Sequence, residues 1–179
     1  MRLKQGDRVP PIQLPAIDNS QFDFSNLNKQ RFLLCFFRFA TCPFCNLRVH
    51  ELTKRYAELG DHFSIVAIFD SPLAHLQKYA SRHNAPFVIL ADAENTYYHQ
   101  YGIENSMLGV LKGMFTRLPS LLNAMFVKGY VPLVMKGSIT TMPADFLVDE
   151  NGMIQTAYYG KDEGDHLPFA QVKAFATGK

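Results

Sequence analysis

The sequence predicts an α/β fold in which a mixed central sheet is flanked by helices. Residues 32–37 and 63–69 are two apolar runs whose length and β-branched or aromatic content are typical of buried strands. Between them, residues 46–58 have the apolar spacing of a helix, and Gly60 follows as a stop signal. Strand, helix and strand in this order make a parallel βαβ unit with a right-handed crossover.

Later segments extend this pattern into one domain, residues 1–179. Ser71 and Pro72 are expected to open a second helix, as its N-cap and its first residue. A short strand over 86–90 and a short helix over 95–101 follow. The end of the chain predicts a hairpin between 145–149 and 153–159 and a closing helix over 168–176.

Composition narrows the function classes. A hydrophobic content of 47% and a charged content of 19% are typical of a globular chain, and a formal charge of +2 is too small to indicate nucleic-acid binding. The first residues show no apolar signal segment, and no run reaches the ~18 apolar residues of a membrane span. Three cysteines do not make a secreted disulfide scaffold. We therefore expect a cytoplasmic protein.

The most informative residues are Cys42 and Cys45, which stand between the first predicted strand and its helix. A thiolate near a first helical turn is stabilised by free backbone N–H groups, so the pKa of Cys42 is expected to be low. Pro43 suits an early helical position. The pair could form a redox couple, a metal half-site or structural thiols. Zinc needs about four ligands, and no second C-x-x-C or spaced His pair supplies them, so the position favours redox chemistry.

Four segments resemble the AhpC/TSA-type redoxins, the peroxiredoxin-like branch of the thioredoxin-like superfamily. They are the C-P-F-C motif at 42–45, G-D-R-V-P-P-I-Q-L-P at 6–15, F-V-I-L-A-D with the following Y-G-I at 87–103, and M-P-A-D-F-L-V-D-E-N-G at 142–152. The resemblance covers nearly the whole chain in the right order. It implies a thioredoxin-like fold, a catalytic Cys42–Cys45 pair that cycles between dithiol and disulfide, and no cofactor or metal.

In this interpretation Cys42 is the more exposed nucleophile and Cys45 resolves its product as a disulfide. The substrate is a protein or small-molecule disulfide, or a peroxide that first gives a sulfenic acid on Cys42. Either route needs an external thiol reductant. Dithiol–disulfide exchange is the first hypothesis, peroxide reduction the second, and a non-catalytic redox-sensing binding module the third.

Neighbouring residues bear on this choice. Thr41, Pro43, Met142 and Pro143 are the expected substrate contacts. Typical peroxiredoxins carry P-x-x-x-T-x-x-C, and this spacing fails here because Thr41 is adjacent to Cys42. Pro143 instead matches the cis-proline of thioredoxin-type oxidoreductases, which exposes backbone groups to an incoming peptide. The resemblance therefore predicts a cis bond between Met142 and Pro143.

Other polar residues near the motif have no assigned role. Arg38 and Arg48 either lower the pKa of Cys42 or are solvated charges. Cys35 lies inside a strand and is expected to be a buried, inert thiol. Asp145 is one of several carboxylates that the sequence alone does not place in a proton pathway.

Residues 105–140 form an insertion that a thioredoxin fold does not need. The segment has no acidic residue, and its apolar residues recur at helical spacing with breaks near Pro119 and Gly129. The ordinary expectation is that this stripe packs on the domain or on a second copy in a homodimer. The alternative is contact with a membrane surface or a lipid substrate through 105–137.

Overall fold

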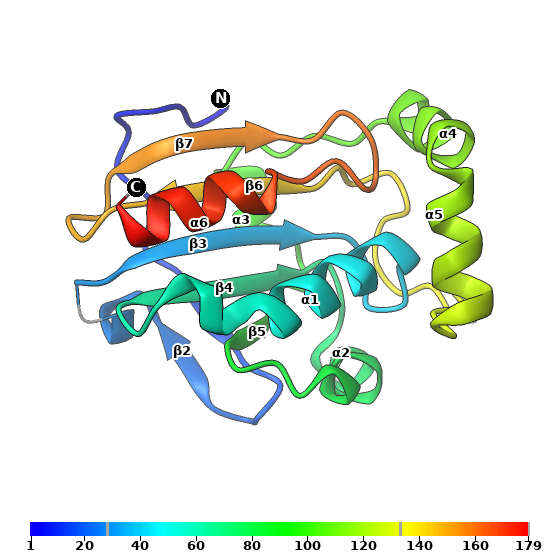
Figure 1. Cartoon of the computed structure of the whole chain (residues 1–179), viewed down its shortest axis with the longest axis horizontal. Helices are drawn as coiled ribbons and strands as arrows, with labels where there is room; N and C mark the ends of the chain where they lie inside the picture. Colours follow the sequence, from blue (N-terminus) through cyan, green and yellow to red (C-terminus); the bar gives the residue numbers. More distant parts are fainter. Residues whose placement is uncertain (28, 133, 179) are drawn as a thin grey trace.

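The computed structural model describes residues 1–27, 29–132 and 134–178, and it confirms the α/β prediction (Figure 1). Its central sheet has the strand order β5-β4-β3-β6-β7. β3 pairs in parallel with β4, and β6 and β7 join antiparallel on the other side of β3. The strand bounds are β3 Arg31–Phe37, β4 Phe63–Phe69, β5 Val88–Ala91, β6 Ala144–Val148 and β7 Ile154–Tyr159.

Alternation along β3 explains why its apolar run is continuous. Leu33, Cys35 and Phe37 join the core on one face of the sheet, whereas the residues between them join the core on the other. The first face is covered by the helices α1 Pro43–Arg55, α2 Leu73–Ala80 and α6 Phe169–Thr177. The second face is covered by α3 Thr96–Gln100 and by the small sheet of β1 Gln13–Pro15 and β2 Gln21–Asp23.

The starts of α1 and α2 differ from the prediction. α1 begins at Pro43, three residues earlier than expected, because the proline needs no hydrogen-bond partner for its nitrogen there. α2 begins one residue later: Pro72 has an extended ψ of 142° and is the N-cap. Ser71 therefore does not cap this helix, and its hydroxyl lies 3.2 Å from Nδ1 of His75.

The two ends of the predicted insertion lie side by side and are hydrogen-bonded to each other. Ser106 N–H donates to the Thr140 carbonyl at 2.8 Å, and Met142 N–H donates to the Glu104 carbonyl at 3.0 Å. Between these ends lie α4 Met107–Thr116, α5 Leu118–Leu122 and a π-helical turn, Asn123–Val127. The helices lie beyond the carboxyl end of β3, next to the start of α1 (Figure 1). None of the helices in the described segments has the length and apolar content to cross a membrane.

The break that was predicted near Pro119 lies at Arg117, between α4 and α5. Pro119 lies in the first turn of α5, where a missing N–H costs nothing. Gly129 follows the helical segment with φ +69°, as expected for a glycine stop. Leu108 and Phe115 are each 80% exposed, so these apolar side chains do not pack on the domain. Of the expected roles of the stripe, contact with a second copy or with a membrane surface stays a prediction.

Candidate active site

Cys42 occupies the N-cap of α1, directly after the chain leaves β3. Its ψ of 122° is extended, and its own N–H donates to the Phe39 carbonyl at 3.0 Å. The backbone N–H groups of Phe44 and Cys45 hydrogen-bond to its sulfur. This confirms the predicted placement of the thiol at the start of a helix, where unpaired N–H groups stabilise a thiolate.

The two thiols of the motif have opposite acidities. Burial raises the pKa of Cys42, but hydrogen bonding from Cys45, the charge of Arg38 and the backbone N–H groups together lower it to about 6. Burial and the adjacent Cys42 raise the pKa of Cys45 well above its usual value. Cys42 is therefore the thiolate at neutral pH and Cys45 the protonated partner that donates to it.

Neither thiol is open to solvent. Cys42 and Cys45 are each 0% exposed, so the expectation that Cys42 is the more exposed of the pair is wrong. The reason is the insertion, whose backbone closes over the start of α1. Thr41 Oγ1 donates to the Val134 carbonyl at 2.9 Å, and a side-chain N–H of Arg38 donates to the carbonyl of Ile139.

Arg38 is the cation of this site and not a solvated charge. It is 5% exposed, and its Nη1 donates to Sγ of Cys42 at 3.7 Å. Its backbone N–H donates to Sγ of Cys45 at 3.4 Å, and its guanidinium lies 5.3 Å from the ring centre of Phe39. One residue therefore contacts both sulfurs and also the covering segment through Ile139.

The loop before α6 adds a buried carboxyl group near this arginine. Glu163 is 2% exposed, and its Oε2 has no hydrogen-bond partner among the described residues. Burial raises the pKa of Glu163, although Arg38 acts in the opposite direction. A Cβ at Gly113 would overlap the Glu163 carboxylate, so α4 packs directly on this side chain.

A second buried polar cluster joins α1, β6 and the loop before α6. Oδ2 of Asp145 accepts the Leu167 N–H at 2.7 Å, and its carboxylate lies 3.1 Å from Nδ1 of His166. Burial raises the pKa of Asp145, but His166, Arg48 and the Leu167 N–H lower it below its usual value. Arg48 is buried, so it is not a solvated charge, and it donates to the Leu167 carbonyl at 2.7 Å.

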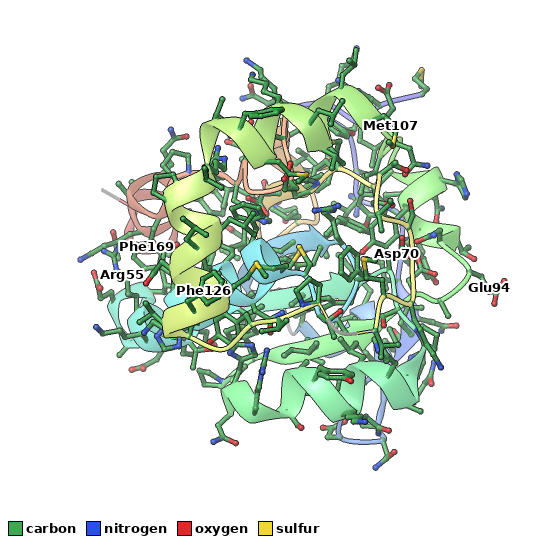
Figure 2. All side chains as sticks on the ribbon, turned by 90° about the vertical axis from the view of Figure 1, so that its right-hand side faces the viewer. Arg55, Asp70, Glu94, Met107, Phe126 and Phe169 are labelled. Carbon is green, nitrogen blue, oxygen red and sulfur yellow. The ribbon has the colours of Figure 1, made fainter. Side chains whose placement is uncertain are left out.

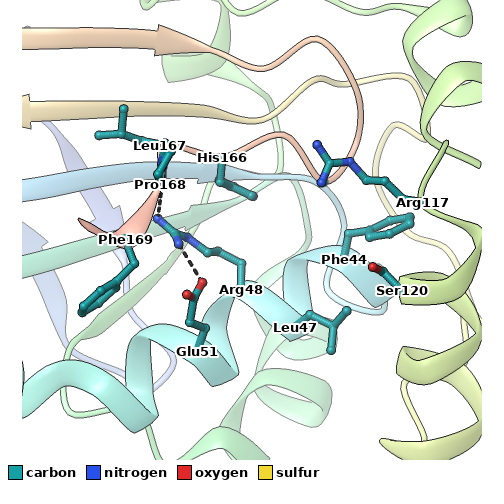
Figure 3. Close-up of a pocket in the computed structure, with 11 residues that line it drawn as sticks. Phe44, Leu47, Arg48, Glu51, Arg117, Ser120, His166, Leu167, Pro168 and Phe169 are labelled. Carbon is teal, nitrogen blue, oxygen red and sulfur yellow. Dashed lines mark hydrogen bonds and ion pairs between the residues drawn. The ribbon is translucent and has the colours of Figure 1, made fainter. Parts of the chain in front are cut away.

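A pocket of about 300 Å³ opens between α1, α5 and the loop before α6 (Figure 3). Phe44 of the C-P-F-C motif borders it, as do Arg117 and His166. Arg117 donates to Asp162 at 2.6 Å. The pocket lies beside the thiols rather than over them: Cys42 and Cys45 are not among its lining residues.

The sequence alone did not indicate Asp145, His166 or Glu163. The one signal in the sequence was the carboxylate of Asp145 within an otherwise apolar strand. In the structure this residue lies opposite Cys35 in the pairing of β3 with β6. Cys35 behaves as predicted. It is fully buried, and burial together with Asp145 raises its pKa well above the ordinary value, which keeps it an unreactive thiol.

The remaining predicted contacts have clear positions. Pro43 is the first residue of α1, and Met142 is buried against Gly109 of α4. The prediction of a cis bond before Pro143 is wrong, because no peptide bond in the described segments is cis. The chain runs from its bridge at Thr141 straight into β6, without the tight turn that a cis-proline usually serves. That these residues contact a substrate stays a prediction.

Metal binding has no visible basis within residues 1–27, 29–132 and 134–178, where no three His, Cys, Asp or Glu side chains gather as a ligand set.

The sequence model of the AhpC/TSA family matches residues 5–157. Peroxiredoxin Bcp of Escherichia coli K12 is 26% identical over 125 residues, which are 68% of this chain and 80% of that protein.

Two solved structures show the likeness in fold. Peroxidoxin BcpB from Mycobacterium tuberculosis has a TM-score of 0.69 at 19% identity and covers 99% of this chain and 98% of its own. A putative thiol:disulfide interchange protein DsbE from Chlorobium tepidum has a TM-score of 0.62 at 19% identity, with 97% and 98% covered. The family match spans most of the sequence and includes both thiols of the C-P-F-C motif. The chain therefore belongs to the AhpC/TSA family and is a peroxiredoxin-like oxidoreductase.

Proposed function

We propose that the protein reduces hydroperoxides with the Cys42 thiolate and closes each cycle by forming a Cys42–Cys45 disulfide. The observation that carries this proposal is the position of Cys42 at the N-cap of α1, with Nη1 of Arg38 3.7 Å from its sulfur. In this setting the pKa of Cys42 is lowered to about 6, whereas that of Cys45 is raised. A nucleophile must be ionised at working pH, and a resolving thiol is best kept protonated until it is needed.

The chemistry has two steps in this protein. The Cys42 thiolate attacks the terminal peroxide oxygen, the O–O bond breaks, and the products are a Cys42 sulfenic acid and an alkoxide that takes up a proton. Cys45 then loses its proton and bonds to the Cys42 sulfur, and the departing hydroxide takes that proton to leave as water. An external thiol reductant returns both sulfurs to the thiol state.

Arg38 has two tasks in the first step. Its charge keeps Cys42 ionised, and its Nη1, 3.7 Å from the sulfur, is placed to donate to peroxide oxygens that arrive there. Hydrogen bonding that strengthens as the O–O bond breaks lowers the barrier, because charge develops on the departing oxygen.

Burial supports a small substrate over a large one. A hydroperoxide needs only a narrow path to Cys42, whose sulfur is 0% exposed. A protein disulfide must bring one of its own sulfurs, and the chain that carries it, into contact with this buried atom. The trans bond before Pro143 also removes one reason to expect peptide docking there. Dithiol–disulfide exchange remains the second candidate, supported by the C-x-x-C pair at the start of a helix.

Stopped-flow kinetics test the proposal. The reduced protein should consume hydrogen peroxide rapidly and end with a Cys42–Cys45 disulfide visible by mass spectrometry. Cys42→Ser should abolish the reaction, Cys45→Ser should stop at a sulfenic acid trapped by dimedone, and the matched control Cys35→Ala should react normally. Slow peroxide consumption together with fast reduction of insulin disulfides would contradict peroxide reduction and favour the second candidate.

A further inference from the structure

α4 presents its large apolar side chains to solvent and its glycines to the protein. Gly109 and Gly113 are its buried residues, and a Cβ at either would overlap Met142 or Glu163. The exposed apolar residues recur at spacings of three and four, so they lie on one face of a helix. That face consists of Met107, Leu108, Leu111, Met114, Phe115 and, after the break, Leu118.

The apolar surface continues along the rest of the insertion. Phe126 is 78% exposed and Val127 is 73% exposed. Met107 and Phe126 lie near opposite ends of the helical segment that faces the viewer in Figure 2. Such a concentration of exposed apolar side chains on one segment is uncommon on a protein that meets only water, and it indicates an interaction site.

Charge on the insertion selects the kind of partner. Residues 105–144 hold four of the 18 Lys and Arg residues and none of the 16 Asp and Glu residues, so their formal charge is +4 and that of the remaining chain is −2. Lys112, Lys128 and Lys136 are exposed, and none has an ion pair within the described residues. Two copies that met through this face would oppose like charges, whereas an anionic surface would complement them.

We propose that the insertion, residues 105–140, docks on the surface of an anionic phospholipid membrane. The apolar face enters the boundary between headgroups and acyl chains, and the three lysines contact the lipid phosphates. Thr41 and Arg38 hydrogen-bond to the insertion backbone at Val134 and Ile139, so a docked insertion holds the start of α1 at the membrane. Docking does not depend on which oxidant Cys42 reduces.

The absence of tryptophan in the chain provides a clean probe. A Phe115→Trp variant has a single indole on the proposed face, and Gln21→Trp, on the exposed edge of β2, is the matched control. With vesicles of phosphatidylglycerol and phosphatidylcholine, fluorescence of the first variant should shift to the blue and that of the control should not. Vesicles of phosphatidylcholine alone should give a much smaller shift.

Vesicle sedimentation of the otherwise native chain measures affinity. Lys112→Glu and Lys128→Glu should each lower the partition coefficient about fivefold or more, since one basic residue at an anionic surface contributes roughly 1 kcal/mol. Lys4→Glu, on the N-terminal arm, should leave it unchanged. Circular dichroism and peroxide consumption confirm that each variant is folded.

Two results would overturn the proposal. Equal binding to neutral and anionic vesicles, or no binding to either, excludes an electrostatic lipid surface. If the protein is instead a dimer in sedimentation and Leu108→Ser with Phe115→Ser makes it monomeric without vesicles, the face is an interface between copies. Failure of docking with normal peroxide kinetics leaves the proposed function intact, and the reverse result leaves docking intact.

Discussion

The guanidinium of Arg38 lies 3.7 Å from the sulfur of Cys42, and both side chains are withdrawn from solvent. Burial alone would raise the pKa of this thiol, so the arginine, the Cys45 thiol and the helix N–H groups together must outweigh it. Acidity at Cys42 is therefore a property of the folded arrangement and not of the C-P-F-C motif by itself.

Replacing Arg38 should show its share of this effect. Arg38→Met is expected to raise the pKa of Cys42, and each unit of rise above the assay pH lowers the thiolate fraction about tenfold. Ultraviolet thiolate absorbance and peroxide kinetics should report the same shift. Arg55→Met, on the far end of α1, is the control and should leave the titration unchanged. An unaltered titration in Arg38→Met would show that the helix and Cys45 suffice.

The pH dependence of stability gives a second test. The folded pKa of Cys42, about 6, lies below the ordinary thiol value of 9.0, so ionisation favours folding. This contribution is full above about pH 9 and is lost as the pH falls through about 6. In urea unfolding of the reduced protein, wild type should therefore gain stability over Cys42→Ala from pH 6 to 9. Parallel curves across that window would contradict the lowered pKa.

Packing of α4 on the thiol site predicts the effect of a single methyl group. A Cβ at Gly113 would overlap the buried Glu163 carboxylate. Overpacking costs about 1–3 kcal/mol, and alanine returns about 1 kcal/mol through helix propensity. Gly113→Ala should therefore displace α4 and speed alkylation of Cys42 by iodoacetamide. If the packing of α4 is weakened by about 1.4 kcal/mol, the rate should rise roughly tenfold.

Thr116→Ala is the matched control, because its side chain is exposed and hydrogen-bonds only within α4. It should leave the alkylation rate unchanged. An unchanged rate in Gly113→Ala as well would mean that Glu163 moves aside and that α4 does not limit access to the sulfur.

The sequence predicted the features that depend on local pattern. Apolar runs located β3 and β4, and the position of Cys42 before a helix predicted its acidity. Strand pairing was beyond such a pattern: Asp145 meets Cys35 only through the register of β6 against β3, and His166 is 21 residues further along the chain. No local signal specifies contacts of that kind.

The insertion shows the same limit in another form. Helical spacing of Leu108 and Phe115 correctly predicted a helix, but periodicity does not tell which face is buried. Close contact is made by Gly109 and Gly113 instead, because residues without a side chain let the helix backbone approach Met142 and Glu163. A stripe of large apolar residues normally turns inward, and here the domain offers it no surface.

Outside the C-P-F-C motif, substitution of Asp145 should lower the free energy of unfolding the most. It is 0% exposed, accepts the Leu167 N–H, and lies beside the His166 ring and the charge of Arg48. Asp145→Asn removes the negative charge that buried Arg48 and the His166 ring face, and loss of one member of a buried charge pair costs about 3–5 kcal/mol. Because folding lowers the pKa of Asp145 below 3.8, its contribution is full above that value and is lost at lower pH. Urea unfolding curves of wild type and variant should thus be far apart at pH 7 and converge below about pH 3.8.

Asp149→Asn is the matched control, because Asp149 is a carboxylate in the β6–β7 turn, and this substitution should lower the free energy of unfolding much less. Equal losses in the two variants would show that burial of Asp145 does not determine its contribution.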